Sequence, residues 1–296
     1  SLTLSAERTN IRTADKSFAA REPALSSEET EDRDFVRALA RGLAVIESFD
    51  DARTALTLSD VARRTGLSRG TVARVLHTLK TLGYLHGDGR HFHLLPRTLK
   101  LGYAYLSSQP LWRLAHPMLE AVAEETGNPC SLSVLDGEEI VYVTWVAAGR
   151  VVFDYVGVGG RLPAFCASMG RVLLAALPDA EIDAFLAKAK LAPRTPRTIT
   201  DPAKLRAILA AVRRNGYGTQ DEEVEPGQRA VAVPVRDDAG NTIAAINVTV
   251  SAHRTTMKQM IDLAVPVLRR EAKRLGEALS LVPARDLSVG RTARVR

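Results

Sequence analysis

Apolar residues recur every three or four positions between residues 58 and 82, and this period predicts two short amphipathic helices joined by a tight turn. Ser59 is placed to cap the first helix, and Gly66 stands where a left-handed residue would end it. Ser68 is placed to cap the second helix. The buried stripe of that helix is expected to contain Val72, Val75, Leu76, Leu79 and Leu82. This pattern is typical of a helix-turn-helix.

The outward face of the second helix carries short polar and cationic side chains, namely Arg69, Thr71, Arg74, Thr78 and Lys80. Such a face fits the major groove of DNA, which is about 12 Å wide. Between Arg53 and Lys100 the chain holds nine Lys or Arg and two acids, a local charge of +7, whereas the whole chain has a net charge of +6. Positive charge concentrated on one segment predicts a phosphate-binding surface, and a solvated basic helical hairpin is the alternative.

After Gly83 the apolar period changes from three or four residues to two, which is typical of strands. Two short runs, 84–85 and 92–94, flank Gly87-Asp88-Gly89 and predict a hairpin. A helix-turn-helix followed directly by a hairpin is a winged helix. His91 and His93 lie on one face of the second strand, but no third ligand has metal-binding spacing, so no metal site is predicted.

The segments on either side of the winged helix are expected to differ: the N-terminal one is expected to be disordered and the following linker helical. Residues 1–32 are polar without a clear period and are expected to form a disordered arm. The winged helix-turn-helix domain would span 33–95 and begin with a helix from Asp34 to Phe49. Its inward stripe is expected to contain Phe35, Leu39, Leu43 and Ile46. A linker helix is expected within 96–110, with Leu99, Tyr103 and Leu106 on one side.

Residues 111–280 are expected to form a second domain, followed by a disordered tail at 281–296. Helices are predicted at 112–126, 168–177, 178–190, a segment capped by Asp201, and 255–279. Strands are predicted at 130–135, 139–146, 151–156, 217–221, 230–236 and 242–251, with a loop at 157–167. Strands joined by hairpins, with helices at both ends, predict an antiparallel sheet covered by helices and an α+β fold class.

A ligand site is suggested by polar groups in this second domain. The glycine-containing loop before Ser168 leads into a helix start, where the amides of Ser168, Met169 and Gly170 would favour a carboxylate. Asn247 and Thr249 alternate with apolar residues on a strand whose face should be covered. Because buried polar groups cost free energy unless they are paired, either a bound ligand or a neighbouring loop would pair them. The sequence leaves both explanations open.

Cys166 is the one candidate nucleophile, because it precedes a helix start that could lower the pKa of its thiol. The second domain holds only His116 and His253 as partners, so no catalytic residue is predicted. The acidic run formed by Asp221, Glu222, Glu223 and Glu225 is interpreted as a solvated turn. Neither the phosphate-loop motif nor the dinucleotide fingerprint is present, and no cofactor is expected.

Composition limits the class of protein. The 296 residues are enough for two domains, and 46% hydrophobic with 25% charged residues is typical of a soluble protein. No apolar run approaches the roughly 18 residues that cross a bilayer, and no secretory signal is evident. The two cysteines cannot form a disulfide framework. A cytoplasmic protein is therefore expected, and the pI near 9.5 points to an anionic partner.

Three segments occur in a characteristic order: LTLSDVARRTGLSRGTVARVLHTLKTLGYL, RLPAFCASMGRVLLAAL and GYGTQDEEVEPGQRAVAVPVRDDAGNTIAAINVTV. With them the chain resembles the IclR family of bacterial transcription regulators over about residues 34–279. The second segment is similar to the subgroup that controls aromatic-acid catabolism through the β-ketoadipate pathway, the Pca and Pob types.

The resemblance implies a winged-helix DNA-binding domain, a linker helix and a GAF-like effector domain in a homodimer or tetramer. Small organic acids bind the effector domain in this family. The corresponding positions in this chain are Cys166, Ser168, Met169, Gly170, Gln220, Ala230, Asn247 and Thr249. Some relatives carry an acid where Gln220 stands and a cysteine where Ala230 stands, so the ligand chemistry cannot be copied from them.

The expected function is a DNA-binding transcription regulator that responds to a small organic acid, with double-stranded operator DNA as its partner and no membrane. The expected DNA contacts are Arg53, Arg64, Ser68, Arg69, Thr71, Arg74, Lys80 and Arg90, with Arg97 also on the backbone. Two alternatives are an enzyme that processes a small acid with Cys166 and an architectural nucleic-acid binder without an effector.

Overall fold

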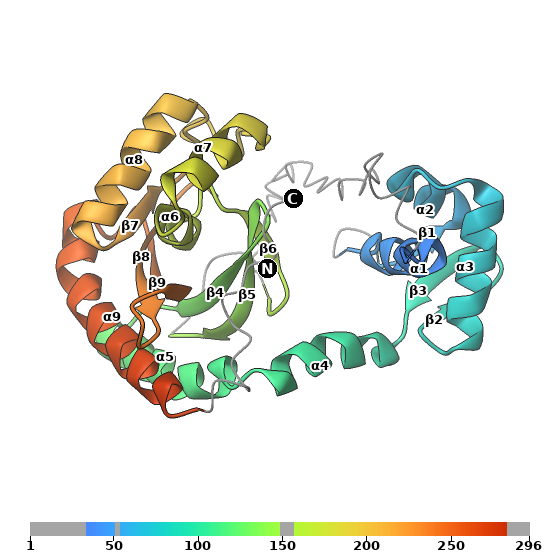
Figure 1. The fold of residues 1–296 in the computed structure, drawn as a ribbon, viewed down its shortest axis with the longest axis horizontal. Coiled ribbons are helices and arrows are strands. Elements are labelled where there is room, and N and C mark those ends of the chain that lie inside the picture. Colours follow the sequence, from blue (N-terminus) through green and yellow to red (C-terminus); the bar gives the residue numbers. More distant parts are fainter. Residues whose placement is uncertain (1–33, 51–53, 149–156, 283–296) are drawn as a thin grey trace, which may run out of the picture. The chain divides into compact units, whose positions relative to one another are not determined.

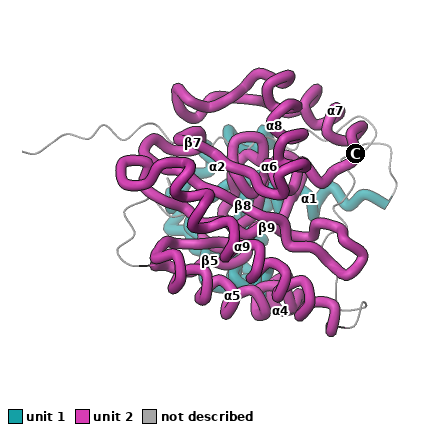
Figure 2. The backbone as a smooth tube through the Cα atoms, turned by 90° about the vertical axis from the view of Figure 1, so that its left-hand side faces the viewer, with its two compact units in different colours: residues 1–103 teal, residues 104–296 magenta. Residues whose placement is uncertain are grey.

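The computed structural model describes residues 34–50, 54–148 and 157–282. The chain forms two compact units, residues 1–103 and 104–296, and the boundary falls within helix α4 (Leu99–Ser108) (Figures 1 and 2). None of the helices in the described ranges has both the length and the apolar character needed to cross a bilayer. The predicted arm, Arg53, the predicted strand at 151–156 and most of the predicted tail lie outside the described residues.

The first unit has the predicted winged helix-turn-helix. Its helices are α1 (Arg37–Glu47), α2 (Leu58–Thr65) and α3 (Arg69–Thr81). A three-stranded antiparallel sheet has the order β1 (Leu56–Thr57), β3 (His91–Leu94), β2 (Leu85–Gly87). The hairpin of β2 and β3 is the predicted wing. The two-residue strand β1 was not predicted, because so short a segment shows no alternation.

The ends of α2 and α3 follow from local hydrogen bonds. Gly66 ends α2 with a left-handed φ of 65°, and the Ser68 hydroxyl accepts a hydrogen bond from the Thr71 amide at 3.3 Å, as predicted. The predicted cap of α2 was wrong. Thr57, not Ser59, caps it in a capping box, in which the Asp60 amide donates to Thr57 Oγ1 at 3.2 Å and the Thr57 amide donates to the Asp60 carboxylate at 3.1 Å.

Two predicted buried stripes are partly wrong. On α3, Val72, Leu76 and Leu79 are buried, but Leu82 lies just past the last helical residue and is 51% exposed. On α1, Leu39 is 62% exposed and Leu43 is 41% exposed, whereas Val45 is fully buried. Periodicity identifies an apolar face of a helix, but the rest of the fold decides whether anything in the same chain covers it.

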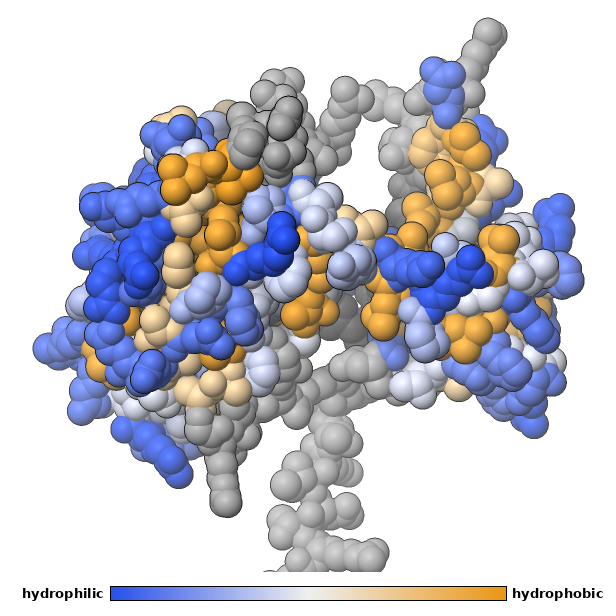
Figure 3. All heavy atoms as spheres, turned by 90° about the horizontal axis from the view of Figure 1, so that it is seen from below, coloured by the Kyte–Doolittle hydropathy of each residue, from blue (hydrophilic) through white to orange (hydrophobic). Residues whose placement is uncertain are grey.

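The predicted linker helix is present. A short 3₁₀ turn, η1 (Pro96–Thr98), leads into α4, none of whose residues is buried. Its apolar side chains are exposed, with Leu99 at 73% and Tyr103 at 65%. In the space-filling view, hydrophobic atoms lie at the surface along this helix (Figure 3).

The second unit contains a six-stranded antiparallel sheet with helices on both faces, which confirms the predicted α+β class. Its strand order is β6 (Arg161–Pro163), β5 (Glu139–Val146), β4 (Cys130–Asp136), β9 (Thr242–Ser251), β8 (Gln228–Arg236), β7 (Gly218–Asp221). The segment 157–167 was predicted to be a loop throughout, but its centre forms the edge strand β6.

Two layers of helices enclose the curled sheet (Figure 1). Helices α5 (Leu111–Thr126) and α9 (Met257–Ser280) pack on one face. Helices α6 (Ser168–Ala175), α7 (Asp179–Lys188) and α8 (Pro202–Asn215) pack on the other, with α6 inside the curl. The alternation of β8 explains both cores, because Val231, Val233 and Val235 face α9 while Ala232 faces α6.

Helix α6 lies very close to its surroundings because small residues face it. A Cβ atom built on Gly218 of β7 would lie 2.9 Å from the carbonyl oxygen of Ser168. A Cβ atom built on Gly170 would lie 2.2 Å from the carbonyl oxygen of Ala164. Both neighbours are backbone atoms, which cannot move aside as a side chain can, so glycine is required at both positions.

Replacing Gly170 with alanine should therefore destabilise the second unit. We expect Gly170→Ala to lower the free energy of unfolding by about 1–3 kcal/mol through overpacking, measured by urea denaturation. Gly102→Ala on α4 is the matched control, since no heavy atom lies within 4 Å of its added Cβ. That control should stabilise its helix by roughly 0.5–1 kcal/mol. Equal effects of the two variants would contradict the assigned close approach.

Candidate nucleic-acid interface and ligand site

The outward face of α3 presents the polar and cationic groups expected of a DNA-reading helix. Arg69, Arg74 and Thr78 are exposed. Arg69 Nη1 donates to Ser59 Oγ of α2 at 2.9 Å, which joins the starts of the two helices. The Ser68 hydroxyl donates to Thr71 Oγ1 at 3.0 Å, so both hydroxyls lie at the exposed first turn. A helix start with this composition favours contact with phosphate or base edges.

Three cations predicted to hold the DNA backbone have partners inside the first unit. Arg64 Nη1 donates to the Ser48 carbonyl at 2.8 Å and to Asp50 at 2.7 Å, which ties α2 to the end of α1. Lys80 Nζ donates to the Gly87 carbonyl at 2.9 Å. Arg97 Nη1 donates to the Leu82 carbonyl at 2.6 Å, and its guanidinium lies over the Tyr84 ring. These three side chains stabilise the winged helix itself.

Two other cations that were predicted to contact DNA do not have such internal partners within the described residues. Arg74 on α3 and Arg90 at the tip of the wing are exposed, and within the described ranges neither side chain has a hydrogen-bond or ion-pair partner. The Arg90 amide and the His91 amide both donate to the Asp88 carboxylate, at 2.8 and 2.7 Å, which fixes the turn. Arg74 and Arg90 are therefore available to a partner molecule.

The histidines of the wing do not form a metal site in the described part of the chain. His93 faces His86 across the hairpin, with the ring centroids 5.0 Å apart. His91 is 4.0 Å from Asp88. No group of three or more His, Cys, Asp or Glu side chains within the described ranges is arranged to hold a metal ion.

The residues predicted to line the ligand site come together on the inner face of the sheet. Gln220 of β7 pairs with Ala230 of β8, which in turn pairs with Thr249 of β9. The next row holds Asn247, which pairs with Ser131 of β4. Because directly paired residues of an antiparallel sheet share a face, these side chains form one surface beside the N-terminal end of α6.

Internal hydrogen bonds satisfy two of these polar groups. Asn247 Oδ1 accepts from the Ser131 amide at 3.0 Å, and its Nδ2 donates to Thr249 Oγ1 at 3.4 Å. Gln220 Oε1 accepts from the Glu223 amide at 3.0 Å. The sequence left open whether a ligand or a neighbouring loop pairs Asn247 and Thr249; in the structure they bond to each other, and Asn247 also bonds to the neighbouring strand β4.

Ser168 differs from these residues. Only 2% of Ser168 is exposed, and its hydroxyl makes no hydrogen bond within the described residues, although it is not one of the described polar atoms that are both fully buried and unpartnered. It stands at the first position of α6, where backbone amides are also unpaired within the helix. A ligand oxygen at this point would supply the missing partner.

Cys166 is buried and is not activated. Burial raises the pKa of its thiol to about 11, although the positive charges of Arg194 and Arg171 oppose the rise. The predicted lowering of this pKa by the helix start was wrong, because the cost of desolvating a thiolate is larger. At neutral pH the side chain is a neutral thiol, which is a poor nucleophile.

Two residues near this site were missed by sequence reasoning. Burial raises the pKa of the Tyr142 hydroxyl, Cys166 raises it further, and Arg194 opposes the rise, so these three groups interact electrostatically. Arg194 Nε donates to the Val224 carbonyl at 3.3 Å, which holds its loop against the segment after β7. Neither residue belongs to a periodic pattern or motif, and only the fold places their charge and hydroxyl beside Cys166.

A buried ion pair locks α6 to that same segment. Arg171 and Glu223 form two parallel bonds of 2.7 and 2.6 Å, and their side chains are 3% and 6% exposed. Arg171 Nε also donates to the Phe165 carbonyl at 3.0 Å. The prediction that the acidic run is a solvated turn was therefore wrong for Glu223, and it fails because the partner lies far away in sequence.

Comparison with known proteins agrees with this arrangement. Residues 38–89 match the model of the IclR helix-turn-helix domain, and residues 103–277 match that of the bacterial transcriptional regulator IclR C-terminal domain. The chain is 42% identical over 240 residues to the Pca regulon regulatory protein of Pseudomonas putida, covering 81% of this chain and 82% of that protein.

Two further relatives are similar to this chain over most of its length. The p-hydroxybenzoate hydroxylase transcriptional activator of Acinetobacter baylyi is 40% identical over 256 residues, covering 84% of this chain and 94% of that protein. The structure of an IclR homologue from Microbacterium hydrocarbonoxydans, complexed with 4-hydroxybenzoate, is 30% identical, with a TM-score of 0.70 and coverage of 83% of this chain and 100% of that one. The protein belongs to the IclR family and is a ligand-responsive, DNA-binding transcription regulator.

Proposed function

We propose that this protein is a cytoplasmic regulator of aromatic-acid catabolism genes and that its effector is a small aromatic carboxylate. Ser168 at the start of α6 carries the proposal, because the residue is 2% exposed and its hydroxyl makes no hydrogen bond within the described residues. The positive charge of Arg194 acts on the neighbouring Cys166 and favours an anion there. Names of relatives support the chemical class, since one is a Pca regulon regulator and another was solved with 4-hydroxybenzoate.

We assign the reading of operator DNA to α3 and the wing. Arg69, Thr71 and Arg74 would contact base edges or nearby phosphates, with Ser68 at the helix start, and Arg90 would contact the backbone from the wing. Arg64, Lys80 and Arg97 have internal partners, so we assign them to holding the unit together. Arg53, outside the described residues, stays a proposed phosphate contact.

Neutralising Arg74 should weaken operator binding. We expect Arg74→Gln to cost about 1–3 kcal/mol of binding free energy if the side chain reads a base, measured by fluorescence anisotropy at fixed salt. Arg254→Gln is the matched control, because Arg254 is an exposed arginine in the second unit, and it should bind as the parent protein does. If Arg74→Gln binds the operator with the affinity of the parent protein, the Arg74 side chain does not contribute to the DNA interface.

An aromatic acid should stabilise the folded protein through Ser168. With 4-hydroxybenzoate at a hundredfold excess over its dissociation constant, we expect stabilisation of about 2.7 kcal/mol, measured as a thermal shift. Ser168→Ala should reduce this shift, because it removes this hydroxyl, whereas Ser280→Ala at the end of α9 should not. A shift that is the same in both variants would argue against the proposed site.

We also propose that the exposed apolar side of α4 mediates self-association. Leu99 and Tyr103 are one helical turn apart and among the most exposed large hydrophobic residues in the described chain. A second copy of α4 would cover both and align two winged helices as a homodimer requires, with a tetramer as a further step.

A negative charge on the exposed apolar side of α4 should weaken the self-association of the protein. We expect Tyr103→Glu to shift the protein toward monomers in sedimentation velocity, because an unpaired carboxylate would be buried between helices. Lys100→Glu on the same helix controls for the introduced charge and should keep the assembled state. If Tyr103→Glu assembles as the parent protein does, the apolar side of α4 is not the self-association interface.

A further inference from the structure

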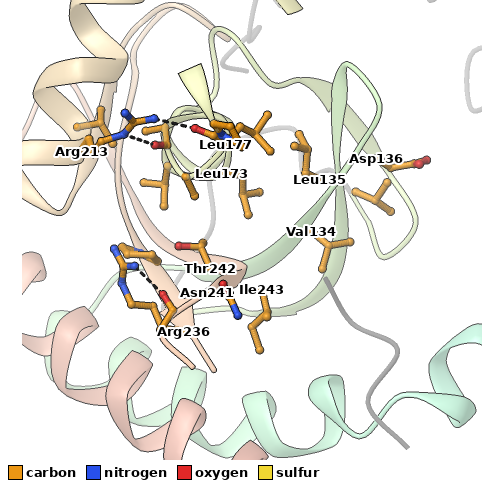
Figure 4. Close-up of a pocket in the computed structure, with 18 of the residues that line it drawn as sticks. Val134, Leu135, Asp136, Leu173, Leu177, Arg213, Arg236, Asn241, Thr242 and Ile243 are labelled. Atoms are coloured by element: carbon orange, nitrogen blue, oxygen red, sulfur yellow. Dashed lines mark hydrogen bonds between the residues drawn. The ribbon is translucent and has the colours of Figure 1, made fainter. Parts of the chain in front are cut away.

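A cavity of about 980 Å³ lies in the second unit beside the C-terminal end of α6 (Figure 4). Its wall is mixed: polar side chains form nearly as much of it as the apolar side chains, which include Val134, Leu135, Leu173, Leu177 and Ile243. Leu173 and Ile243 also belong to the buried cores, so the floor of the cavity lies against the core, while the cavity itself is about half open to solvent. Ser168 stands at the opposite end of α6, and the predicted effector residues do not line this cavity.

Polar groups gather on one wall of the cavity. Arg236 at the end of β8 pairs in register with Thr242 at the start of β9, so their side chains are neighbours (Figure 4). Thr242 Oγ1 is buried and has no hydrogen-bond partner among the described residues. Arg236 Nη1 donates to the Gly240 carbonyl at 2.9 Å, which leaves the other guanidinium nitrogens without a partner in the described ranges. A buried hydroxyl and a cation without an anion both favour an acidic ligand group.

The other charged groups at the cavity are already neutralised. Arg213 donates to the carbonyls of Ala175 and Leu177 and pairs with Asp179 at 2.8 Å. Arg161 pairs with Asp136 at 2.7 Å, and the Asp136 carboxylate points away from the other labelled side chains (Figure 4). Arg236, which is exposed, is therefore the cavity-lining arginine without an ion-pair partner among the described residues.

The cavity also includes a residue of α4. Tyr105 lines it from the last turns of that helix. Burial and the negative charge of Asp136 raise the pKa of Tyr105, so its hydroxyl stays protonated and can donate a hydrogen bond. Because the chain runs through α4 to the DNA-binding unit, a molecule that contacts Tyr105 would act on the segment connecting the two units.

We propose that this cavity is a second small-molecule site, which binds an amphipathic organic carboxylate larger than a single-ring acid. The carboxylate would lie at Arg236 and Thr242, and the apolar body would lie against Leu135, Leu173 and Ile243. Small-molecule pockets span about 300–1,000 Å³, so this cavity is near the upper end and suits a two-ring or medium-chain acid. The site is separate from the proposed effector site. Binding of the acid at this site does not rest on the proposed function; only an effect of that binding on DNA recognition would rest on it.

The test is isothermal titration calorimetry of the full chain with 2-naphthoate, a two-ring acid, and with 2-naphthamide, its uncharged analogue. We expect 2-naphthoate to bind the parent protein and Arg254→Gln alike. Arg236→Gln and the use of 2-naphthamide should each weaken binding at least tenfold, because either change removes the charge-assisted bond. Ala176→Trp places a bulky ring at an exposed lining residue and should block binding.

Several outcomes would overturn the site. One is an absence of 2-naphthoate binding, and another is equal affinity in Arg236→Gln and the parent protein. Competition by saturating 4-hydroxybenzoate would place the ligand in the effector site instead. An altered sedimentation coefficient in Ala176→Trp without any naphthoate binding would identify the surface as a contact between protein chains. A protein that binds 2-naphthoate as expected but ignores 4-hydroxybenzoate would refute the proposed effector and leave this site standing.

Discussion

The close approach of α6 to the sheet is the constraint on which the effector unit depends. Gly170 lets the helix backbone touch the backbone at Ala164, and Gly218 does the same from β7. The buried pair of Arg171 and Glu223 then fixes the helix against the segment after β7. Removing one partner of such a pair leaves a buried charge uncompensated, which is strongly destabilising, so the helix has little freedom to shift unless the whole arrangement changes.

This placement gives the two ends of α6 different chemistry. At its first residue, the hydroxyl of Ser168 and unpaired amides stand near Cys166, whose pKa is influenced by the charge of Arg194. Near its last residues, the carbonyls of Ala175 and Leu177 are satisfied by Arg213, and a cavity of mixed polar and apolar lining contains Arg236 and Tyr105 of α4. The two proposed sites lie at opposite ends of α6, so ligands that each favour the same position of this helix would be coupled through it.

In the DNA-binding unit the positive charges fall into two groups. Arg64 and Lys80 hold the helices and the wing together by donating to backbone carbonyls. Arg74 and Arg90 extend outward without partners among the described residues. A count of charge along the sequence cannot separate these groups. The local charge of +7 between Arg53 and Lys100 therefore predicts DNA as the partner, in agreement with the family. It overestimates how many of these cations are available to contact DNA.

Local signals in the sequence determined most of the elements. The apolar period, the glycine at Gly66 and the cap at Ser68 predicted α2 and α3, and the turn around Asp88 predicted the wing. These features depend on hydrogen bonds and packing within a few residues, so they can be read from a short window. The alternation of Asn247 and Thr249 likewise identified a polar surface on a covered strand.

Contacts between distant residues were decided by the tertiary structure alone. Glu223 is buried because Arg171 lies beside it, Leu39 is exposed because nothing in the described first unit covers it, and Cys166 stays protonated because the fold removes it from water. The partners of Arg64 and the meeting of Arg236 with Thr242 also depend on turns and strand register. Local sequence sets which residues form a helix or strand, whereas burial and charge pairing depend on which elements the fold brings together.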